Sequence, residues 1–281
     1  MGIEVKYGRE LEDVSKFIDT LGSMKKVVFV TTSSRSPYVE EFGESPKSSQ
    51  LAKSLAKALI NRNVNVEIID GAKLNIYNCL GCVSEVHGNH CGVKEAKVKD
   101  EAKNPNGLLR CWASHDFEDD ELWKISKSIY ESQAVIFFGS QRWGSVNAIY
   151  QKIIERLDWM ENMHTTLGER NSISEIHSGL ILIGQNWRVQ ESLELQKEVL
   201  GLFGFKQNED LYLGWQFTRD MSDENKGSYK DAPSAFGDSW NIDVYRWEKK
   251  PGTELEVEQK TDESKQHVRD FSSFLEAIKA L

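Results

Sequence analysis

The stretch Ala134-Val-Ile-Phe-Phe-Gly-Ser-Gln-Arg-Trp-Gly-Ser-Val-Asn-Ala-Ile-Tyr-Gln-Lys-Ile-Ile-Glu-Arg-Leu157 decides the fold class. Its first five residues are all apolar, which is typical of a strand buried on both faces of a parallel sheet. From Val146 to Met160, apolar residues recur at helical spacing. A loop of small and polar residues, 139–145, separates the two. The order predicts a βα unit whose loop leaves the carboxyl end of its strand, where open parallel sheets bind ligands.

This loop resembles the second flavin loop of the flavodoxin-like NAD(P)H-dependent FMN reductases and quinone reductases. In that family the loop reads small-Pro-x-Tyr/Trp-Trp/Phe-Gly-Ser/Gly-x-x-Ala and leads into a similar helix. Gln141, Arg142, Trp143 and Gly144 fall on it, and Ser140 stands near the place of the family's proline. Glycine lets the backbone approach a ligand closely, and a tryptophan ring can cover an aromatic system. The resemblance implies that these four residues contact FMN.

Composition excludes several classes of function. The chain has 281 residues, of which 39% are hydrophobic, and this suits one large core in one elaborated domain. The formal net charge of −9 disfavours a nucleic-acid partner, because phosphate binding needs a basic face. Apolar runs are too short to span a membrane, and the start Met1-Gly-Ile-Glu-Val-Lys lacks the pattern of a signal peptide. We therefore expect a cytoplasmic protein without a membrane partner.

Apolar runs alternate with amphipathic stretches along the middle of the chain. Strands are expected at 27–30, 64–69, 134–138, 179–184 and 211–217, and helices at 49–62, 118–132, 147–162 and 189–203. The alternation predicts an α/β fold, a three-layer doubly wound sandwich with helices on both faces of a five-stranded parallel sheet. The family resemblance implies the strand order 2-1-3-4-5.

Both ends of the chain are expected to extend this unit. An amphipathic helix is predicted at 8–21, and another apolar helical face at 262–280. The segment 218–260 is polar yet contains five aromatic residues, so we expect a lid or a dimer arm there instead of a plain linker. The predicted parts are an N-terminal helical extension (1–24), a flavodoxin-like FMN-binding domain (25–217) and a C-terminal extension (218–281). The resemblance also implies a homodimer or homotetramer.

Hydroxyl groups gather after the first strand, in Thr31-Thr-Ser-Ser-Arg-Ser36, and Ser48, Ser49 and Gln50 open the next helix. The start of a helix offers unpaired N–H groups and a favourable dipole to an anion, and Arg35 can add a charge-assisted hydrogen bond. The pattern suits a phosphate monoester. The family's phosphate loop is similar, and it implies contacts from Ser33, Arg35, Ser48 and Gln50, although the inserted segment 37–47 is longer than usual. Simple helix capping by Ser48 or Ser49 is the alternative interpretation.

A third loop, Gly184-Gln-Asn-Trp-Arg188, follows the fourth strand, where the family places its last ring contacts. Gln185, Asn186 and Trp187 are therefore cofactor candidates, since an amide can bind the pyrimidine edge and an indole can stack on the ring. Packing is the alternative role for Trp187. The sequence contains neither G-x-G-x-x-G after its first strand nor G-x-x-x-x-G-K-[ST]. A single FMN phosphate needs neither.

Four cysteines carry the competing chemical signal, and they are Cys79, Cys82, Cys91 and Cys111. Two thiolates three residues apart plus two others are able to hold zinc or an iron–sulfur cluster. Iron–sulfur flavoproteins, which resemble this family, carry a more compact run of cysteines here, whereas relatives without a cluster keep a Cys-x-Gly-Cys pair. Free or redox-labile thiols are therefore expected and no metal is assigned, with a bound metal as the alternative.

The resemblance implies an FMN-dependent NAD(P)H oxidoreductase that passes electrons to a quinone, nitro, azo or free-flavin acceptor. Because the cofactor carries the chemistry, no catalytic side chain is assigned. One alternative is an electron carrier of the flavodoxin or iron–sulfur-flavoprotein type without nicotinamide chemistry. Another is a binding module that has lost flavin, favoured if the segment 37–47 blocks the phosphate site.

Overall fold

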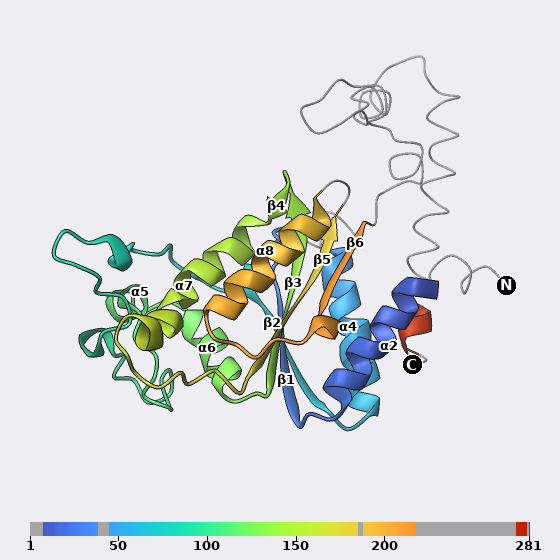
Figure 1. Ribbon diagram of the computed structural model, residues 1–281, viewed down its shortest axis with the longest axis horizontal. Helices are drawn as coiled ribbons and strands as arrows, with labels where there is room; N and C mark the ends of the chain where they lie inside the picture. Colours follow the sequence, from blue (N-terminus) through green and yellow to red (C-terminus); the bar gives the residue numbers. More distant parts are fainter. Residues whose placement is uncertain (1–7, 39–44, 185–187, 217–273, 280) are drawn as a thin grey trace, which may run out of the picture.

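The computed structural model describes residues 8–38, 45–184, 188–216, 274–279 and 281 (Figure 1). A six-stranded sheet forms its centre, in the order β2-β1-β3-β5-β6, with β4 paired to β3. The strands are β1 (Lys26–Thr31), β2 (Asn65–Asp70), β3 (Ala134–Arg142), β4 (Ser145–Val146), β5 (His177–Gly184) and β6 (Tyr212–Gln216). Every neighbouring pair in the main order is parallel, and only the two-residue β4 is antiparallel. Without β4 the order along the chain is 2-1-3-4-5, so the predicted doubly wound fold is confirmed.

The two central apolar runs lie where the sequence predicts them. Residues 27–30 of β1 and 134–138 of β3 are all fully buried. The ring centroids of Phe29 and Phe138 lie 4.9 Å apart, on neighbouring strands. At Gly179 a Cβ atom would meet the carbonyl oxygen of Leu211 at 2.6 Å, so β5 needs a glycine there. Continuous apolar sequence is required because helices cover both faces of the sheet.

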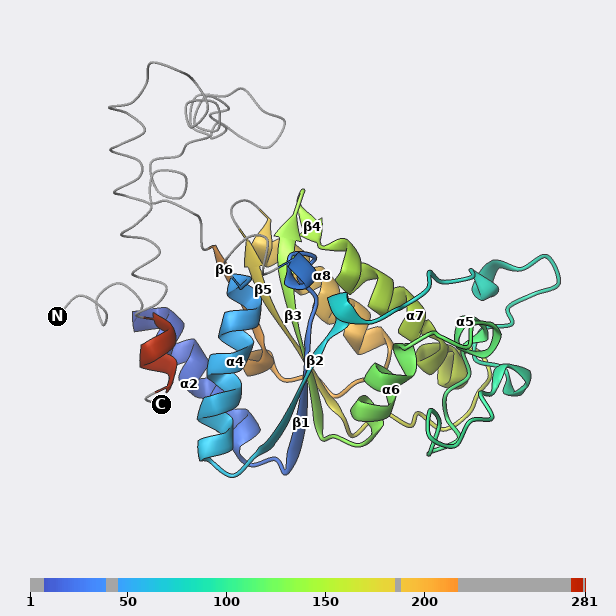
Figure 2. The same ribbon diagram turned by 180° about the vertical axis from the view of Figure 1, so that it is seen from behind.

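The helices are α2 (Gly8–Gly22), α4 (Lys47–Asn61), α5 (Trp112–Asp116), α6 (Leu122–Tyr130), α7 (Ala148–Thr165) and α8 (Val189–Leu202). Figures 1 and 2 show α6, α7 and α8 on one face of the sheet and α4 with α2 on the other, which gives the three layers. A short terminal helix, residues 274–279, lies beside α2. Within the described residues, no helix is both long and apolar enough to cross a membrane.

The N-terminal helix belongs to the main core. Val14, Phe17, Ile18 and Leu21 of α2 are fully buried, and the ring centroid of Phe17 lies 6.4 Å from that of Phe29. Phe274 and Ile278 of the terminal helix are also fully buried. The predicted lid or dimer arm at 218–260 lies outside the described residues, and the proposed domain limits stay a prediction.

One helix starts later than its sequence suggests. A helix was expected from Glu118, but α6 begins at Leu122, because the acidic run makes long-range contacts. The Asp119 carboxylate accepts hydrogen bonds from the side chains of Asn75 and Tyr77 at 2.8 and 3.0 Å. Asp120 accepts one from the backbone N–H of Tyr77 at 3.1 Å. These carboxylates hold the chain that leaves β2 instead of beginning a helix.

Candidate cofactor site at the carboxyl edge of the sheet

The loop after β1, residues 32–36, forms the first part of the site and is called the first loop below. Thr32 and Ser33 are buried, whereas Arg35 is exposed. The Ser36 N–H donates to the Ser33 carbonyl oxygen at 3.0 Å, and the Ser36 hydroxyl donates to the carboxylate of Asp70 at the end of β2. Asp70 therefore holds the first loop against the neighbouring strand.

The start of α4 lies at the same edge of the sheet (Figure 2). Its N-cap residue is Pro46, which makes no side-chain capping hydrogen bond. Ser48 and Ser49 are buried, and the Ser49 hydroxyl has no hydrogen-bond partner in the described part of the chain. Gln50 donates from its side-chain amide to the Ser45 carbonyl oxygen at 2.6 Å, so it organises the loop before the helix. An uncapped helix start with a buried, unpaired hydroxyl matches the needs of a phosphate group.

The segment 139–145 is a β-hairpin and not the open loop expected from its small residues. Strand β3 continues to Arg142, and β4 pairs back on it through Gln141↔Val146 and Arg142↔Ser145. Trp143 and Gly144 form the tip with φ values of 50° and 76°. Two-residue hairpin turns of type I′ have positive φ at both central residues, and here a tryptophan adopts it. The Trp143 side chain is 88% exposed.

Gln141 faces the protein interior, unlike the rest of the hairpin tip. Its side-chain amide donates to the Arg188 carbonyl oxygen at 3.2 Å and to the Ser192 hydroxyl at 3.1 Å. The Ser192 hydroxyl in turn donates to the Gly144 carbonyl oxygen at 3.1 Å. Gln141 thus fastens the hairpin to the start of α8. The predicted cofactor contacts Gln185, Asn186 and Trp187 lie outside the described residues.

Sequence reasoning missed two side chains at this edge, Asp70 and Asn147. Asp70 directly follows the predicted strand 64–69, and Asn147 is the first residue of the predicted helix 147–162. Asn147 is 3% exposed and forms hydrogen bonds to both the first loop and the hairpin. The sequence signal for Asn147 was only a polar residue at the start of a helix. Such a residue is common as an ordinary helix cap, so it does not point to a contact with a distant loop.

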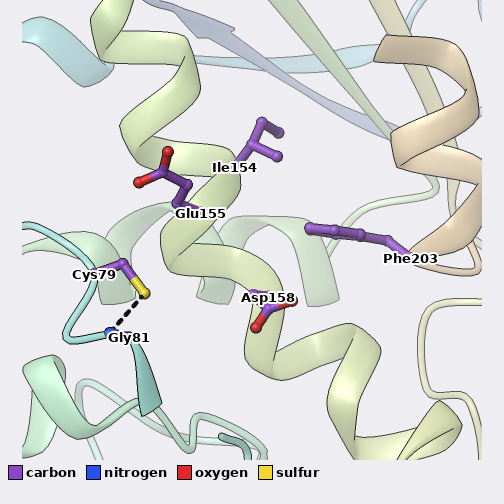
Figure 3. A pocket seen from close by; sticks show the side chains of 6 residues that line it. All are labelled: Cys79, Gly81, Ile154, Glu155, Asp158 and Phe203. Atoms are coloured by element: carbon purple, nitrogen blue, oxygen red, sulfur yellow. Dashed lines mark hydrogen bonds between the residues drawn. The ribbon is translucent and has the colours of Figure 1, made fainter. Parts of the chain in front are cut away.

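A separate cavity of about 440 Å³ lies beside α7, away from the hairpin and the first loop. Its lining residues are Cys79, Gly81, Ile154, Glu155, Asp158 and Phe203 (Figure 3). The Gly81 N–H donates to the Cys79 sulfur at 3.4 Å. The cavity is therefore a feature of the cysteine-bearing segment and α7.

The cysteines are free thiols in the described structure. Burial raises the pKa of Cys82 to about 11, and burial together with the nearby Asp158 carboxylate raises the pKa of Cys91 strongly. The Cys111 sulfur accepts a hydrogen bond from the Arg156 guanidinium at 3.4 Å. Across the described ranges, no three His, Cys, Asp or Glu side chains are grouped to hold a metal ion.

No family model matches the sequence, and none of the curated proteins matches it. Similar solved structures include RosB with a bound 8-demethyl-8-formylriboflavin-5'-phosphate, at 13% identity and a TM-score of 0.48, covering 92% of this chain and 80% of that one. An azoreductase from Bacillus anthracis strain Sterne is 12% identical with a TM-score of 0.43, covering 92% of this chain and all of its own (100%). The NAD(P)H:(acceptor) oxidoreductase FerB from Paracoccus denitrificans is 15% identical with a TM-score of 0.41, covering 86% and 98%.

The order of the five parallel strands decides the class. This is a flavodoxin-like fold. In a flavodoxin-like sheet the order reverses between β1 and β3, and ligands bind outside the carboxyl ends of the strands at that point. The first loop follows β1 and the hairpin extends β3, so both parts of the candidate site flank the position where the flavodoxin-like fold binds its ligand.

Proposed function

We propose that the protein binds FMN at this edge and acts as an NAD(P)H-dependent FMN oxidoreductase. The observation that carries the proposal is the Ser49 hydroxyl, which is buried at the uncapped start of α4 without a partner in the described structure. An unsatisfied buried hydroxyl costs free energy unless water or a ligand completes it. A phosphate monoester completes both the hydroxyl and the helix N–H groups.

The phosphate would be held by Ser33, Ser48 and Ser49, with the exposed Arg35 supplying positive charge. The overall charge of the chain is negative, so a local arrangement of N–H and hydroxyl donors is the feature that selects an anion here. Gln50 acts indirectly, since its amide is bonded to Ser45.

The ring would lie along the hairpin tip, where Arg142 and Gly144 offer main-chain groups and Trp143 an aromatic face. Gln141 supports this tip from behind through Arg188 and Ser192. Gln185, Asn186 and Trp187 stay predicted contacts for the opposite edge of the ring. When bound, FMN takes a hydride from NADH or NADPH and passes electrons onward. The proposed acceptor is a quinone, nitro, azo or free-flavin compound.

The deciding experiment is an absorption spectrum of the purified protein after incubation with FMN and desalting, followed by NADH or NADPH without oxygen. Two oxidised-flavin bands that bleach on addition of the nucleotide are expected. Bands that persist would favour an electron carrier instead, and the absence of bands would contradict FMN binding. Light scattering of the same sample tests the predicted homodimer or homotetramer.

Two matched serine variants test the phosphate site. Ser49→Ala should raise the Kd for FMN by roughly tenfold or more, since a hydrogen bond to a charged group is lost. Without FMN it should be as stable as the wild type or more so, because the replaced hydroxyl has no partner among the described residues. Ser54→Ala is the control, because Ser54 is buried on the same helix, beyond its first turn. Equal FMN affinity in both variants would place the phosphate elsewhere.

A further inference from the structure

Asn147 lies where β4 ends and α7 begins, and it is the N-cap residue of that helix. Asparagine is a preferred N-cap because its side chain usually accepts a hydrogen bond from the first turn. Here the side chain makes no such bond, although it is almost completely buried, with 3% exposed. A different role must account for its burial.

The carboxamide of Asn147 joins the first loop to the hairpin. Its Nδ2 donates to the Thr32 carbonyl oxygen, while its Oδ1 accepts from the Thr32 hydroxyl at 3.1 Å and from the Ser140 N–H at 3.2 Å. Thr32 also donates its own N–H to the Phe138 carbonyl oxygen at 3.0 Å. The contacts connect residues that are 115 and 7 positions apart in the sequence.

These contacts require an amide. The Thr32 carbonyl oxygen needs a donor, and the Ser140 N–H needs an acceptor. These two partners therefore determine which side of the Asn147 carboxamide carries the nitrogen and which the oxygen. Aspartate keeps the acceptor and loses the donor, and its charge would face the Thr32 carbonyl oxygen.

We propose that Asn147 is a positioning residue that sets the separation between the first loop and the hairpin. The inference rests on the proposed function, in which the first loop holds the phosphate of FMN and the hairpin holds its ring. A single molecule that contacts both parts binds more tightly when their separation is fixed beforehand. Binding then costs less conformational entropy, because the two loops need not be ordered by the ligand. Asn147 itself does not touch the reacting atoms.

The first measurement needs no FMN. Amide hydrogen exchange of Ser140 is compared in the wild type, Asn147→Ala and Asn104→Ala. Asn104 is the matched control, because its buried carboxamide also ties a loop through three hydrogen bonds, to Val98 and twice to Leu109. Exchange at Ser140 should become at least about tenfold faster in Asn147→Ala only, since its N–H loses a buried acceptor. Unchanged protection of Ser140 would overturn the proposal.

The second measurement is the Kd for FMN in the same proteins. Asn147→Ala should raise the Kd by about tenfold, whereas Asn104→Ala should leave it unchanged. If Asn147→Ala does not fold, Thr32→Val and Thr32→Ser replace it. Thr32→Val removes the hydroxyl, which bonds both Asn147 and the Phe138 carbonyl oxygen at 3.0 Å, and should raise the Kd for FMN. Thr32→Ser keeps the hydroxyl and should bind FMN as the wild type does. A wild type that binds no FMN would contradict the proposed function, while the exchange result still decides the role of Asn147. Wild-type affinity in a folded Asn147→Ala variant would refute the positioning role alone.

Discussion

Arg156 and Asp120 form a salt bridge that is completely buried, with 0% of either side chain exposed and 2.9 Å between the charged groups. Both terminal nitrogens of the guanidinium take part, each 2.9 Å from one carboxylate oxygen. Arg156 also donates to the Tyr77 carbonyl oxygen at 2.7 Å. Through this pair, α7 holds the start of α6 and the chain that leaves β2.

Removing one partner of this pair should destabilise the protein strongly. Asp120→Asn leaves an uncompensated buried guanidinium, and about 3–5 kcal/mol of unfolding free energy is the expected loss. Urea denaturation followed by circular dichroism measures it. The control is Lys16→Gln, which breaks the exposed pair of Lys16 with Glu12 and should leave the urea midpoint unchanged. A small loss in Asp120→Asn would mean that water reaches the pair.

The Asp120 carboxylate should also contribute to the pH dependence of the unfolding free energy. Burial acts to raise the pKa of Asp120, but hydrogen bonds from Arg156 and Ser114 outweigh it, so its pKa lies below the ordinary value of 3.8. A lowered pKa contributes stability that is complete above the unfolded-state value and is lost as the pH falls through the folded-state value. The wild type should therefore lose more stability between pH 5 and acid conditions, roughly pH 2, than Asp120→Asn does. Parallel curves for the two proteins would contradict this assignment.

Asp158 should behave in the opposite sense. Burial raises its pKa, and a hydrogen bond from Cys91 only partly offsets that effect. A raised pKa means that ionisation disfavours the fold, so this carboxylate is most favourable at low pH and becomes less so as the pH rises. Asp158→Asn keeps an oxygen for the Asn162 amide, which donates to Asp158 at 2.9 Å. The variant should be more stable than the wild type at pH 7, with the difference vanishing in acid. Thermal melts at several pH values test this.

The N-terminal helix should be required for the stability of the sheet. Phe17→Ala removes a fully buried ring that packs near Phe29, and a loss of about 3–5 kcal/mol is expected from the cavity it leaves. Leu195→Ala on α8 is the control, since Leu195 is 55% exposed. If Phe17→Ala has the same urea midpoint of unfolding as the wild type, α2 is only loosely packed against the sheet.

Trp143 should matter for flavin and not for folding. Its φ of 50° is unfavourable for a residue with a Cβ atom, so Trp143→Gly should leave stability unchanged or raise it by up to about 1 kcal/mol. In the variant, the fluorescence of bound FMN should rise, because a stacked indole quenches a flavin. Unchanged fluorescence would place the ring away from the hairpin tip. Trp123→Phe is a tryptophan control outside the edge.

Local sequence was sufficient for most of the layered fold. The apolar runs at 27–30 and 134–138 predict buried parallel strands, and the spacing in α4, α7 and α8 predicts their buried faces, because periodicity reports which side of an element meets the core. The strand order agrees with the family resemblance. At the candidate site, Ser48 and Ser49 were predicted from their place at the start of a helix, and residues 141–144 from their place after a strand. Their contacts with FMN stay predictions.

Only the tertiary structure decided the contacts between these elements. The hairpin of 139–146, the inward direction of Gln141, the carboxamide of Asn147 and the Arg156–Asp120 pair depend on partners that are distant in sequence. Hydrogen bonds of this kind produce no periodic pattern in the sequence. A single polar residue has the same sequence appearance whether it caps a helix or joins two loops. The sequence by itself predicted the parallel sheet, which the structure confirms, and the edge of the sheet proposed to bind a ligand. Packing alone decided which polar side chains face that edge and which hold it together.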